Sequence, residues 1–293
     1  MAPGARDAAP EAGRPPSRAG RNLPAAITTG VALFAYIIAT LLWWNWGFAL
    51  FVAVALTAGV WELNRALRLI DVKPAFWPIA VLTPVTILGS YWLGARPHGI
   101  GDGVAFVIAG LVVATISSMF WRIRDGVAGY VRDVSGSLFI IGYLMLLGST
   151  LTLMLADDNG AARVMSYLVC VVASDTGAYA VGVLLGRHKL APRISPAKTW
   201  EGLAGGITCA VIVGAVVARF ALDAPWWVGA VLGLALALAA TMGDLIESMV
   251  KRDTGLKDMS HLLPGHGGAM DRLDSLVVGG PIAWAILYAL VPR

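Results

Sequence analysis

Ionisable residues gather in one stretch of this apolar chain, residues 248–275, SMVKRDTGLKDMSHLLPGHGGAMDRLDS. Asp, Glu, Lys and Arg form 14% of the whole sequence, against about 25% in soluble proteins. Near the end of the stretch, Asp271 and Asp274 are three residues apart and share one face of the helix expected there. Cations beside such carboxylates suit the binding of a phosphate together with a metal ion. The cations expected to take part are Lys251, Arg252 and Lys257.

A turn precedes the two aspartates. Pro264, Gly265, Gly267 and Gly268 surround His266, and such residues let the backbone turn sharply and approach a ligand closely. The alternative is a solvated loop whose positive charge only marks the cytoplasmic side of a membrane protein. The combination of carboxylates, cations and turn residues favours a site for phosphate and metal.

A carboxylate also lies inside an apolar segment. Asp175 is near the middle of the otherwise uncharged run 164–186, where an unpaired carboxylate costs about 2.5–3.5 kcal/mol to insert into a bilayer. We therefore expect Asp175 to face a polar cavity. The alternative is a structural hydrogen bond from Asp175 to another helix.

Asp244 follows another uncharged run, and Glu247 lies on the same helical face. We expect Asp244 to be a metal ligand and Glu247 to support it, although an i,i+4 ion pair with Lys251 competes for Glu247. If Asp244 meets Asp271 and Asp274, the three carboxylates need a cation to compensate their repulsion. Oxygen ligands favour Mg²⁺, and the sequence leaves open whether one or two cations bind.

A second charged loop covers residues 186–206, GRHKLAPRISPAKTWEGLAGG. Ser195 opens a Ser-Pro turn signal, and Lys198 and Thr199 stand just before the next apolar segment. A basic cytoplasmic loop could simply attract anionic lipid headgroups. The alternative is that Lys198 contacts a phosphate of the substrate.

The elements that must position these residues are membrane helices. Hydrophobic residues make up 58% of the chain, and a bilayer span needs about 20 mostly apolar residues. The sequence predicts an all-α polytopic membrane protein, with a disordered basic tail over 1–22 and one transmembrane domain over 23–293. The nine predicted spans are roughly 24–43, 45–64, 74–94, 103–121, 136–156, 163–185, 202–221, 225–249 and 272–291.

The distribution of Lys and Arg residues among the connections predicts the membrane topology. Alternating connections place 18 of the 22 Lys and Arg residues on one side of these nine spans. Because cytoplasmic loops are enriched in cations, the amino terminus and both charged loops are expected in the cytoplasm. We expect the protein in the cell membrane.

Two motifs resemble one family. The run from Ser248 through Lys251-Arg252 and Lys257-Asp258 to Pro264-x-His266-Gly267-Gly268-x-x-Asp271-Arg272-Leu273-Asp274 is similar to the signature of CDP-diacylglycerol synthases, the phosphatidate cytidylyltransferases. The second motif is Ser195-Pro196-x-Lys198-Thr199-x-Glu201-Gly202, preceded by Ala178-Tyr179-x-x-Gly182. Ala269 and Ala197 depart from the usual pattern of the family. The resemblance covers residues 175–275.

The resemblance implies an integral membrane enzyme that joins CTP and phosphatidate to give CDP-diacylglycerol and pyrophosphate. It implies that Asp244, Asp271 and Asp274 hold the metal and that Asp271, Asp274, Lys198, Lys251 and Arg252 act in catalysis. The residues expected to bind the substrates are Ser195, Lys198, Thr199, Lys257, His266, Gly267, Gly268, Arg272 and Asp175.

Two other functions compete. A CTP-dependent lipid alcohol kinase would share part of the carboxyl-terminal pattern, but would release CDP instead of pyrophosphate. A transporter would use Asp175 and Asp244 for coupling ions, yet it has no need of the charged loop with His266. The bilayer is an expected partner and nucleic acid is not, while a homodimer is left open.

Overall fold

The computed structural model describes residues 23–260, 262 and 267–291. The predicted tail over 1–22 and His266 lie outside these residues. The elements, in chain order, are α1 (Leu23–Trp43), α2 (Asn45–Leu69), α3 (Phe76–Gly94), α4 (Ile100–Ile123), α5 (Tyr130–Ile140), the π-helix η1 (Ile141–Leu146), α6 (Leu147–Ala156), α7 (Gly160–Leu185), β1 (Lys189–Ala191), β2 (Ser195–Thr199), α8 (Trp200–Ala221), α9 (Trp226–Asp253) and α10 (Met270–Leu290).

The expected all-α membrane fold is confirmed. Among the described residues, 8 helical segments are long and apolar enough to cross a bilayer, and Ile27–Trp43 forms a shorter apolar helix. Each of the nine spans predicted from the sequence coincides with one of these segments. The agreement follows from composition, because a chain in lipid must satisfy its backbone hydrogen bonds within each span.

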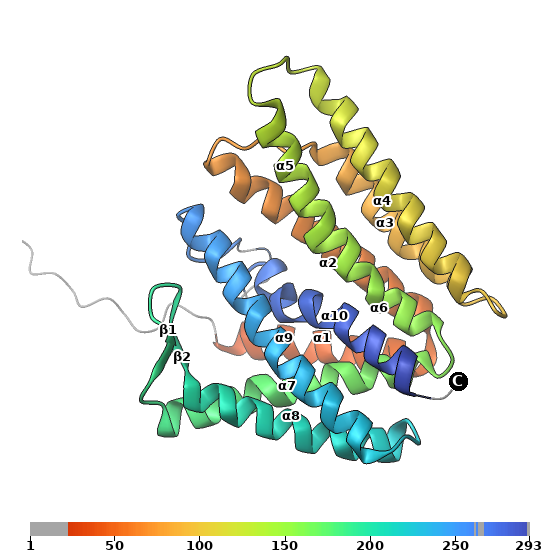
Figure 1. The fold of residues 1–293 in the computed structure, drawn as a ribbon, viewed down its shortest axis with the longest axis vertical. Helices are drawn as coiled ribbons and strands as arrows, with labels where there is room; N and C mark the ends of the chain where they lie inside the picture. Colours follow the sequence, from red (N-terminus) through yellow and green to blue (C-terminus); the bar gives the residue numbers. More distant parts are fainter. Residues whose placement is uncertain (1–22, 261, 263–266, 292–293) are drawn as a thin grey trace, which may run out of the picture.

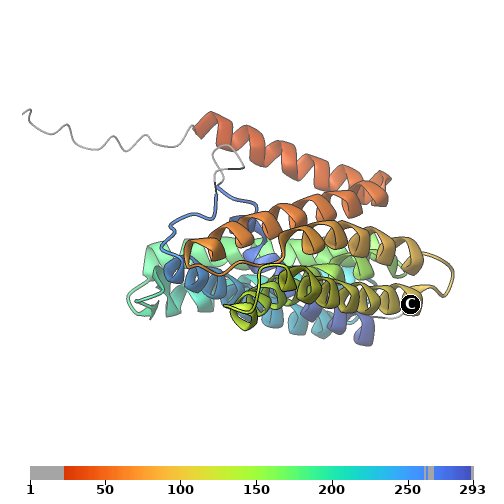
Figure 2. The ribbon, with the colours of Figure 1, turned by 90° about the horizontal axis from the view of Figure 1, so that it is seen from above.

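The helices form two packed groups (Figure 1). In one group, α7, α8 and α9 pack in series and α10 lies against α9. In the other, α3 packs against both α2 and α4. Helix α1 lies obliquely over one face of the bundle, where it contacts α2 and α7 (Figure 2).

The continuous helical segment α5–η1–α6 is the central span. Of its most apolar window, 72% is buried inside the protein, against 22% for α4. Its buried side chains include Leu144, Met145 and Met154, and α6 contacts α3 and α10 from the two groups. This segment therefore links the two groups through its apolar side chains.

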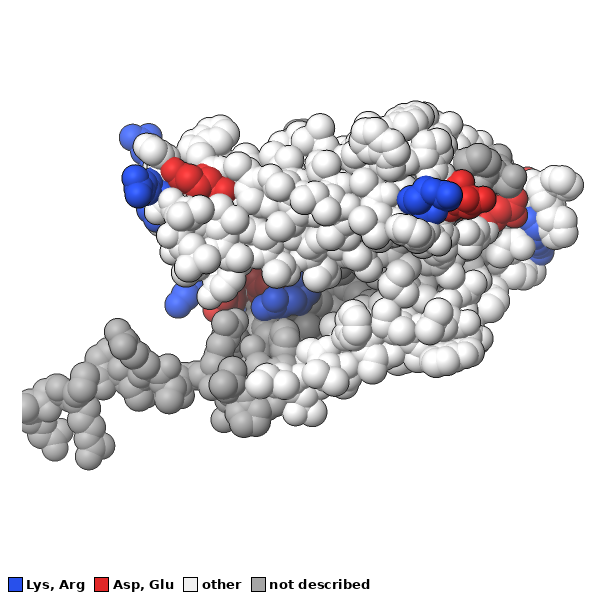
Figure 3. Space-filling model, turned by 90° about the horizontal axis from the view of Figure 1, so that it is seen from below, with Lys and Arg blue, Asp and Glu red and all other residues white. Residues whose placement is uncertain are grey.

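The surface matches a bilayer setting. Figure 3 shows charged side chains at the two ends of the molecule, an uncharged surface between them, and a hollow that contains charged side chains. Large apolar residues such as Phe34, Phe120 and Phe220 are exposed on the protein surface. In a bilayer these side chains would contact lipid.

The loop predicted before α8 contains a short β-hairpin. Strands β1 and β2 pair antiparallel, with Lys189 opposite Thr199 and Ala191 opposite Ser195. Strands this short carry no clear alternation of apolar and polar residues, so the sequence pattern does not reveal them. The hairpin leads directly into α8 and presents Lys198 near the helix start.

Candidate active site

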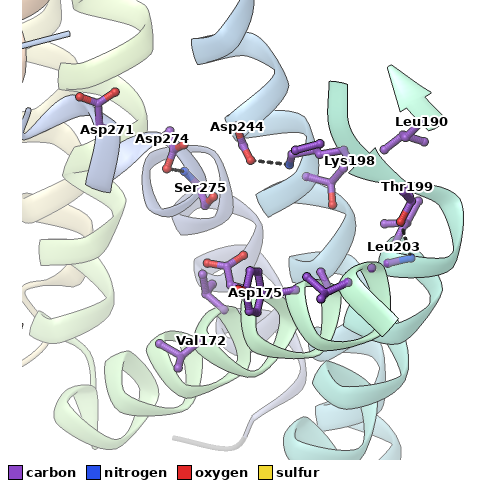
Figure 4. Close-up of a pocket in the computed structure, with 18 of the residues that line it drawn as sticks. Val172, Asp175, Leu190, Lys198, Thr199, Leu203, Asp244, Asp271, Asp274 and Ser275 are labelled. Carbon is purple, nitrogen blue, oxygen red and sulfur yellow. Dashed lines mark hydrogen bonds and ion pairs between the residues drawn. The ribbon is translucent and has the colours of Figure 1, made fainter. Parts of the chain in front are cut away.

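A cavity of about 630 Å³ lies among α7, the hairpin, α8, α9 and α10. It gathers predicted site residues from segments far apart in the sequence (Figure 4). The predicted residues that line it are Asp175, Lys198, Thr199, Asp244, Asp271, Arg272 and Asp274. Asp175 thus faces a polar cavity, as its place in an apolar helix predicts.

Close packing of α9 against α10 brings two of the carboxylates together. A Cβ atom added at Gly243 would lie 2.3 Å from the Asp274 carbonyl oxygen, so the helices can approach this closely only because residue 243 is glycine. Asp244 is the next residue, and Glu247 lies one turn farther on. Ligand oxygens of Asp244, Glu247 and Asp274 lie within 4.8 Å of one another.

Asp271 has a different environment. Its Oδ1 accepts a hydrogen bond from Lys251 Nζ at 2.9 Å, and its Oδ2 accepts from the backbone N–H groups of Gly268 at 2.8 Å and Met259 at 3.1 Å. Lys251 Nζ also lies 2.5 Å from Glu247 Oε2. The ion pair considered from the sequence is therefore present, and Glu247 lies with Asp244 and Asp274 in one carboxylate cluster.

Lys198 reaches the site from the end of β2. Its Nζ lies 2.5 Å from Asp244 Oδ2, shown as a dashed line in Figure 4. The next residue, Thr199, caps α8 by accepting a hydrogen bond from the Gly202 N–H at 3.1 Å. The cap fixes where the helix starts and hence where the ammonium group of Lys198 stands.

Glu201, in the first turn of α8, holds the two residues that lead into β1, the other strand of the hairpin. Its carboxylate lies 2.5 Å from His188 Nδ1 and accepts hydrogen bonds from the backbone N–H groups of Arg187 and His188. The base of the hairpin is thereby tied to the helix. This arrangement holds the strand that carries Lys198 over the cavity.

Other predicted residues lie at the margin. Arg252 is exposed and donates from Nε to the Ile194 carbonyl at 3.3 Å, and Lys257 is exposed. Ser195 is half-buried in β2, while Gly267, with a φ of +86°, adopts the left-handed conformation that favours glycine. Gly268 is buried and touches the site through its hydrogen bond to Asp271.

The charge balance of the site favours a cation. With Glu247 and Lys251 at its border, the cavity has five carboxylates and three cationic side chains, a difference of two if all are ionised. Glu247 is 1% exposed, and its Oε1 has no hydrogen-bond donor among the described residues. Clustered carboxylates repel each other unless a cation compensates them. The oxygens of Asp244, Glu247 and Asp274 therefore fit a divalent ion that prefers oxygen ligands.

Tyr143 is a candidate that the sequence did not reveal. It stands in the π-helix η1 with a buried hydroxyl that has no partner among the described residues. The carboxylates of Asp274, Glu247 and Asp244 act on this hydroxyl electrostatically. π-Helical turns often accompany functional sites, but nothing in the local sequence marks this one.

Known proteins match nearly the entire chain. The sequence model of the cytidylyltransferase family matches residues 24–290. The chain belongs to the cytidylyltransferase family. It is 38% identical over 306 residues to a protein of Mycobacterium leprae (strain TN) named phosphatidate cytidylyltransferase, with 98% of this chain and 95% of that protein covered.

Two further relatives of the same name extend this cytidylyltransferase assignment. The protein of Mycobacterium tuberculosis (strain ATCC 25618 / H37Rv) is 38% identical over 94% of this chain and 85% of its own length. The protein of Brucella suis biovar 1 (strain 1330) is 34% identical over 91% of this chain and 92% of its own length. The resemblance seen in residues 175–275 is confirmed, and it extends to the first five spans, where we recognise no motif.

Proposed function

We propose that this chain forms CDP-diacylglycerol and pyrophosphate from CTP and phosphatidate. The observation that carries the proposal is its identity of 38%, over 98% of the chain, with a protein named phosphatidate cytidylyltransferase. The site supports the same reaction, because it combines clustered carboxylates with the cationic side chains of Lys198, Lys251 and Arg272.

In the proposed reaction, a phosphate oxygen of phosphatidate attacks the α-phosphorus of CTP. The new P–O bond forms as the bond from that phosphorus to the pyrophosphate group breaks, and pyrophosphate leaves. A phosphate monoester already carries nucleophilic oxygens, so no side chain needs to remove a proton. The protein must instead hold two anions in line and compensate their charge.

The cationic residues divide by position. Lys198 lies inside the cavity and is the best placed to contact a transferring phosphate. Lys251 is held by Glu247 and Asp271 at the border of the cavity, and Arg272 lines it. Arg252 and Lys257 are exposed, so we assign them to substrate phosphates at the mouth of the site.

We assign the metal position to Asp244, Glu247 and Asp274, with Mg²⁺ as the ion. When bound, Mg²⁺ would neutralise phosphate oxygens of CTP and of the leaving pyrophosphate. Asp271, also predicted as a ligand, would act in the same site by setting the position of the Lys251 ammonium group.

We further propose that the amino terminus and the active site face the cytoplasm at the cell membrane, where CTP is available. Cysteines introduced at positions 190 and 256 should then be labelled by a membrane-impermeant reagent only from the cytoplasmic side, and one at position 159 only from outside. Cys170 is buried and Cys209 is half-buried, so the unmodified chain gives the background labelling. Labelling of position 256 from outside would reverse the proposed orientation.

Identification of the products tests the function itself. Purified protein is incubated with Mg²⁺ and CTP labelled at the α-phosphorus, with phosphatidate in one reaction and a long-chain lipid alcohol in a parallel one. Transfer of the label to the lipid together with release of pyrophosphate supports the cytidylyltransferase reaction. Release of CDP with an unlabelled lipid would identify a kinase instead, and no turnover of CTP at all would contradict both.

A further inference from the structure

Glu62 connects the amino-terminal helices to the active site. It belongs to α2, is 0% exposed, and lies within a span predicted from apolar composition. Its carboxylate reaches the start of α10, more than 190 residues along the chain. Oε1 accepts from the Ala269 N–H at 2.9 Å, and Oε2 accepts from the Met270 N–H at 2.6 Å.

A third donor, the Ser260 hydroxyl, bonds to Oε1. Burying a carboxylate without partners is costly, and these three hydrogen bonds offset that cost. Two of the donors are backbone N–H groups at the amino end of a helix, where a negative charge is also favoured by the helix dipole. Glu62 therefore acts as a cap for α10 supplied by a different helix.

Within the described residues, the N-cap position of α10 supplies no side-chain cap. The residue there, Ala269, makes no side-chain capping hydrogen bond. The first turn of α10 carries Asp271, and the next carries Asp274. The direction of both carboxylates therefore depends on how the beginning of α10 is held, and Glu62 holds the backbone N–H groups of Ala269 and Met270 from another helix.

We propose that Glu62 is a positioning residue for the active site, a role that rests on the function proposed above. By fixing the first turn of α10, it sets Asp274 against Asp244 and Glu247 and sets Asp271 against Lys251. It touches no substrate itself. The amino-terminal half of the chain thus contributes to catalysis through α2.

Gly268 gives independent support for this arrangement. A Cβ atom added there would lie 2.6 Å from Glu62 Oε1 and 3.0 Å from Asp271 Oδ2. A side chain at this position would collide with both the capping carboxylate of Glu62 and the site carboxylate of Asp271. The motif glycine is therefore explained by the space that Glu62 occupies, in addition to the turn itself.

The test must separate positioning from a general loss of stability. Glu62→Gln keeps the shape of the side chain but removes the charge and one acceptor. Asp133→Asn is the matched control, because Asp133 is also 0% exposed and bonded to three donors, but belongs to a cluster that shares no residue with the active site. Binding of Mn²⁺ alone, followed by electron paramagnetic resonance, reports on the carboxylates without requiring turnover.

We expect Glu62→Gln to weaken Mn²⁺ binding about 10- to 100-fold, the usual effect of losing a residue that orients metal ligands. Its kcat should fall by a similar factor, while Asp133→Asn binds Mn²⁺ like the unmodified protein. Ser260→Ala, which removes one of the three donors, provides a milder variant if Glu62→Gln does not fold, and should weaken binding by a smaller factor.

The proposal would be overturned if Glu62→Gln bound Mn²⁺ as tightly as the unmodified protein. If only Ser260→Ala folds, the same comparison is made with that variant. Equal weakening in the control variant would also overturn the proposal, since that would reveal a general effect of destabilisation. If the unmodified protein forms no CDP-diacylglycerol and yet Mn²⁺ binding depends on Glu62, the proposed function fails while the positioning role stands. The proposed function is therefore tested by product formation, and the positioning role of Glu62 is tested by Mn²⁺ binding.

Discussion

Two clusters of buried charge in this molecule differ in how completely their charges are paired. In the cluster at the end of α4 and the start of α5, Asp133 accepts hydrogen bonds from Arg122 Nε at 2.7 Å, the Lys73 N–H at 2.9 Å and Arg132 Nε at 3.3 Å. The remaining guanidinium nitrogens of Arg122 donate to the carbonyls of Gly126 and Ala128. This cluster is complete without a ligand.

The second cluster, formed by Asp244, Glu247 and Asp274, is not complete. Three carboxylates lie within 4.8 Å of one another, and Glu247 Oε1 has no donor among the described residues. Folding alone does not favour such an arrangement, because like charges repel and buried polar atoms are normally paired. A buried charge with all its partners indicates a structural role, whereas a surplus of one sign indicates a ligand site.

The largest expected effect comes from Asp274→Asn. Loss of one metal ligand should lower turnover on the order of 10³-fold or more, since the bound ion supplies several kcal/mol of charge stabilisation. Without metal, the same variant should have a thermal midpoint equal to or above that of the unmodified protein, because one repelling charge is gone. Both are measured on detergent-purified protein. A lower thermal midpoint together with near-normal activity would show that Asp274 has a structural role and does not bind the metal.

Lys198→Ala should have the next largest effect. If Lys198 contacts a phosphate in a site with little water, its loss should cost at least about a hundredfold in kcat, as for other transition-state donors. Lys198→Arg should recover little, because a planar guanidinium does not replace a compact ammonium group. If Lys198 only attracts lipid headgroups, it contributes about 1 kcal/mol, screened by salt. A loss of kcat below tenfold that becomes smaller at high ionic strength would support this second interpretation, in which Lys198 only attracts lipid headgroups.

The sequence predicts the spans well because hydropathy is local. Every span follows from a run of apolar residues, and Asp175 stands out because it interrupts one. The sequence does not predict which carboxylates meet, because their positions depend on how each helix is rotated about its axis. Asp271 and Asp274 share a helical face, yet Lys251 and Gly268 hold Asp271 while Asp274 meets Asp244.

The partner of Glu62 could not be predicted either. A glutamate near the end of a predicted span indicates that the helix reaches the membrane surface at that point. Its contacts with Ser260 and Met270 join positions 198 and 208 residues away. The charge itself was the available signal, as it was for Asp175, and the structure alone shows what compensates it.

The smallest effect on turnover is expected from Asp133→Asn, which tests the complete cluster. Removing one partner of a buried ion pair typically costs about 3–5 kcal/mol, because the other charge is left buried and unpaired. The thermal midpoint should fall by several degrees, with or without metal. The two clusters share no residue, so kcat per folded molecule should stay within about twofold, as expected for independent sites. Asp133→Asn combined with Arg122→Met should recover part of the lost stability, because the unpaired guanidinium group is then absent. A large fall in kcat with an unchanged thermal midpoint would show that pairing does not distinguish structural from functional charge in this protein.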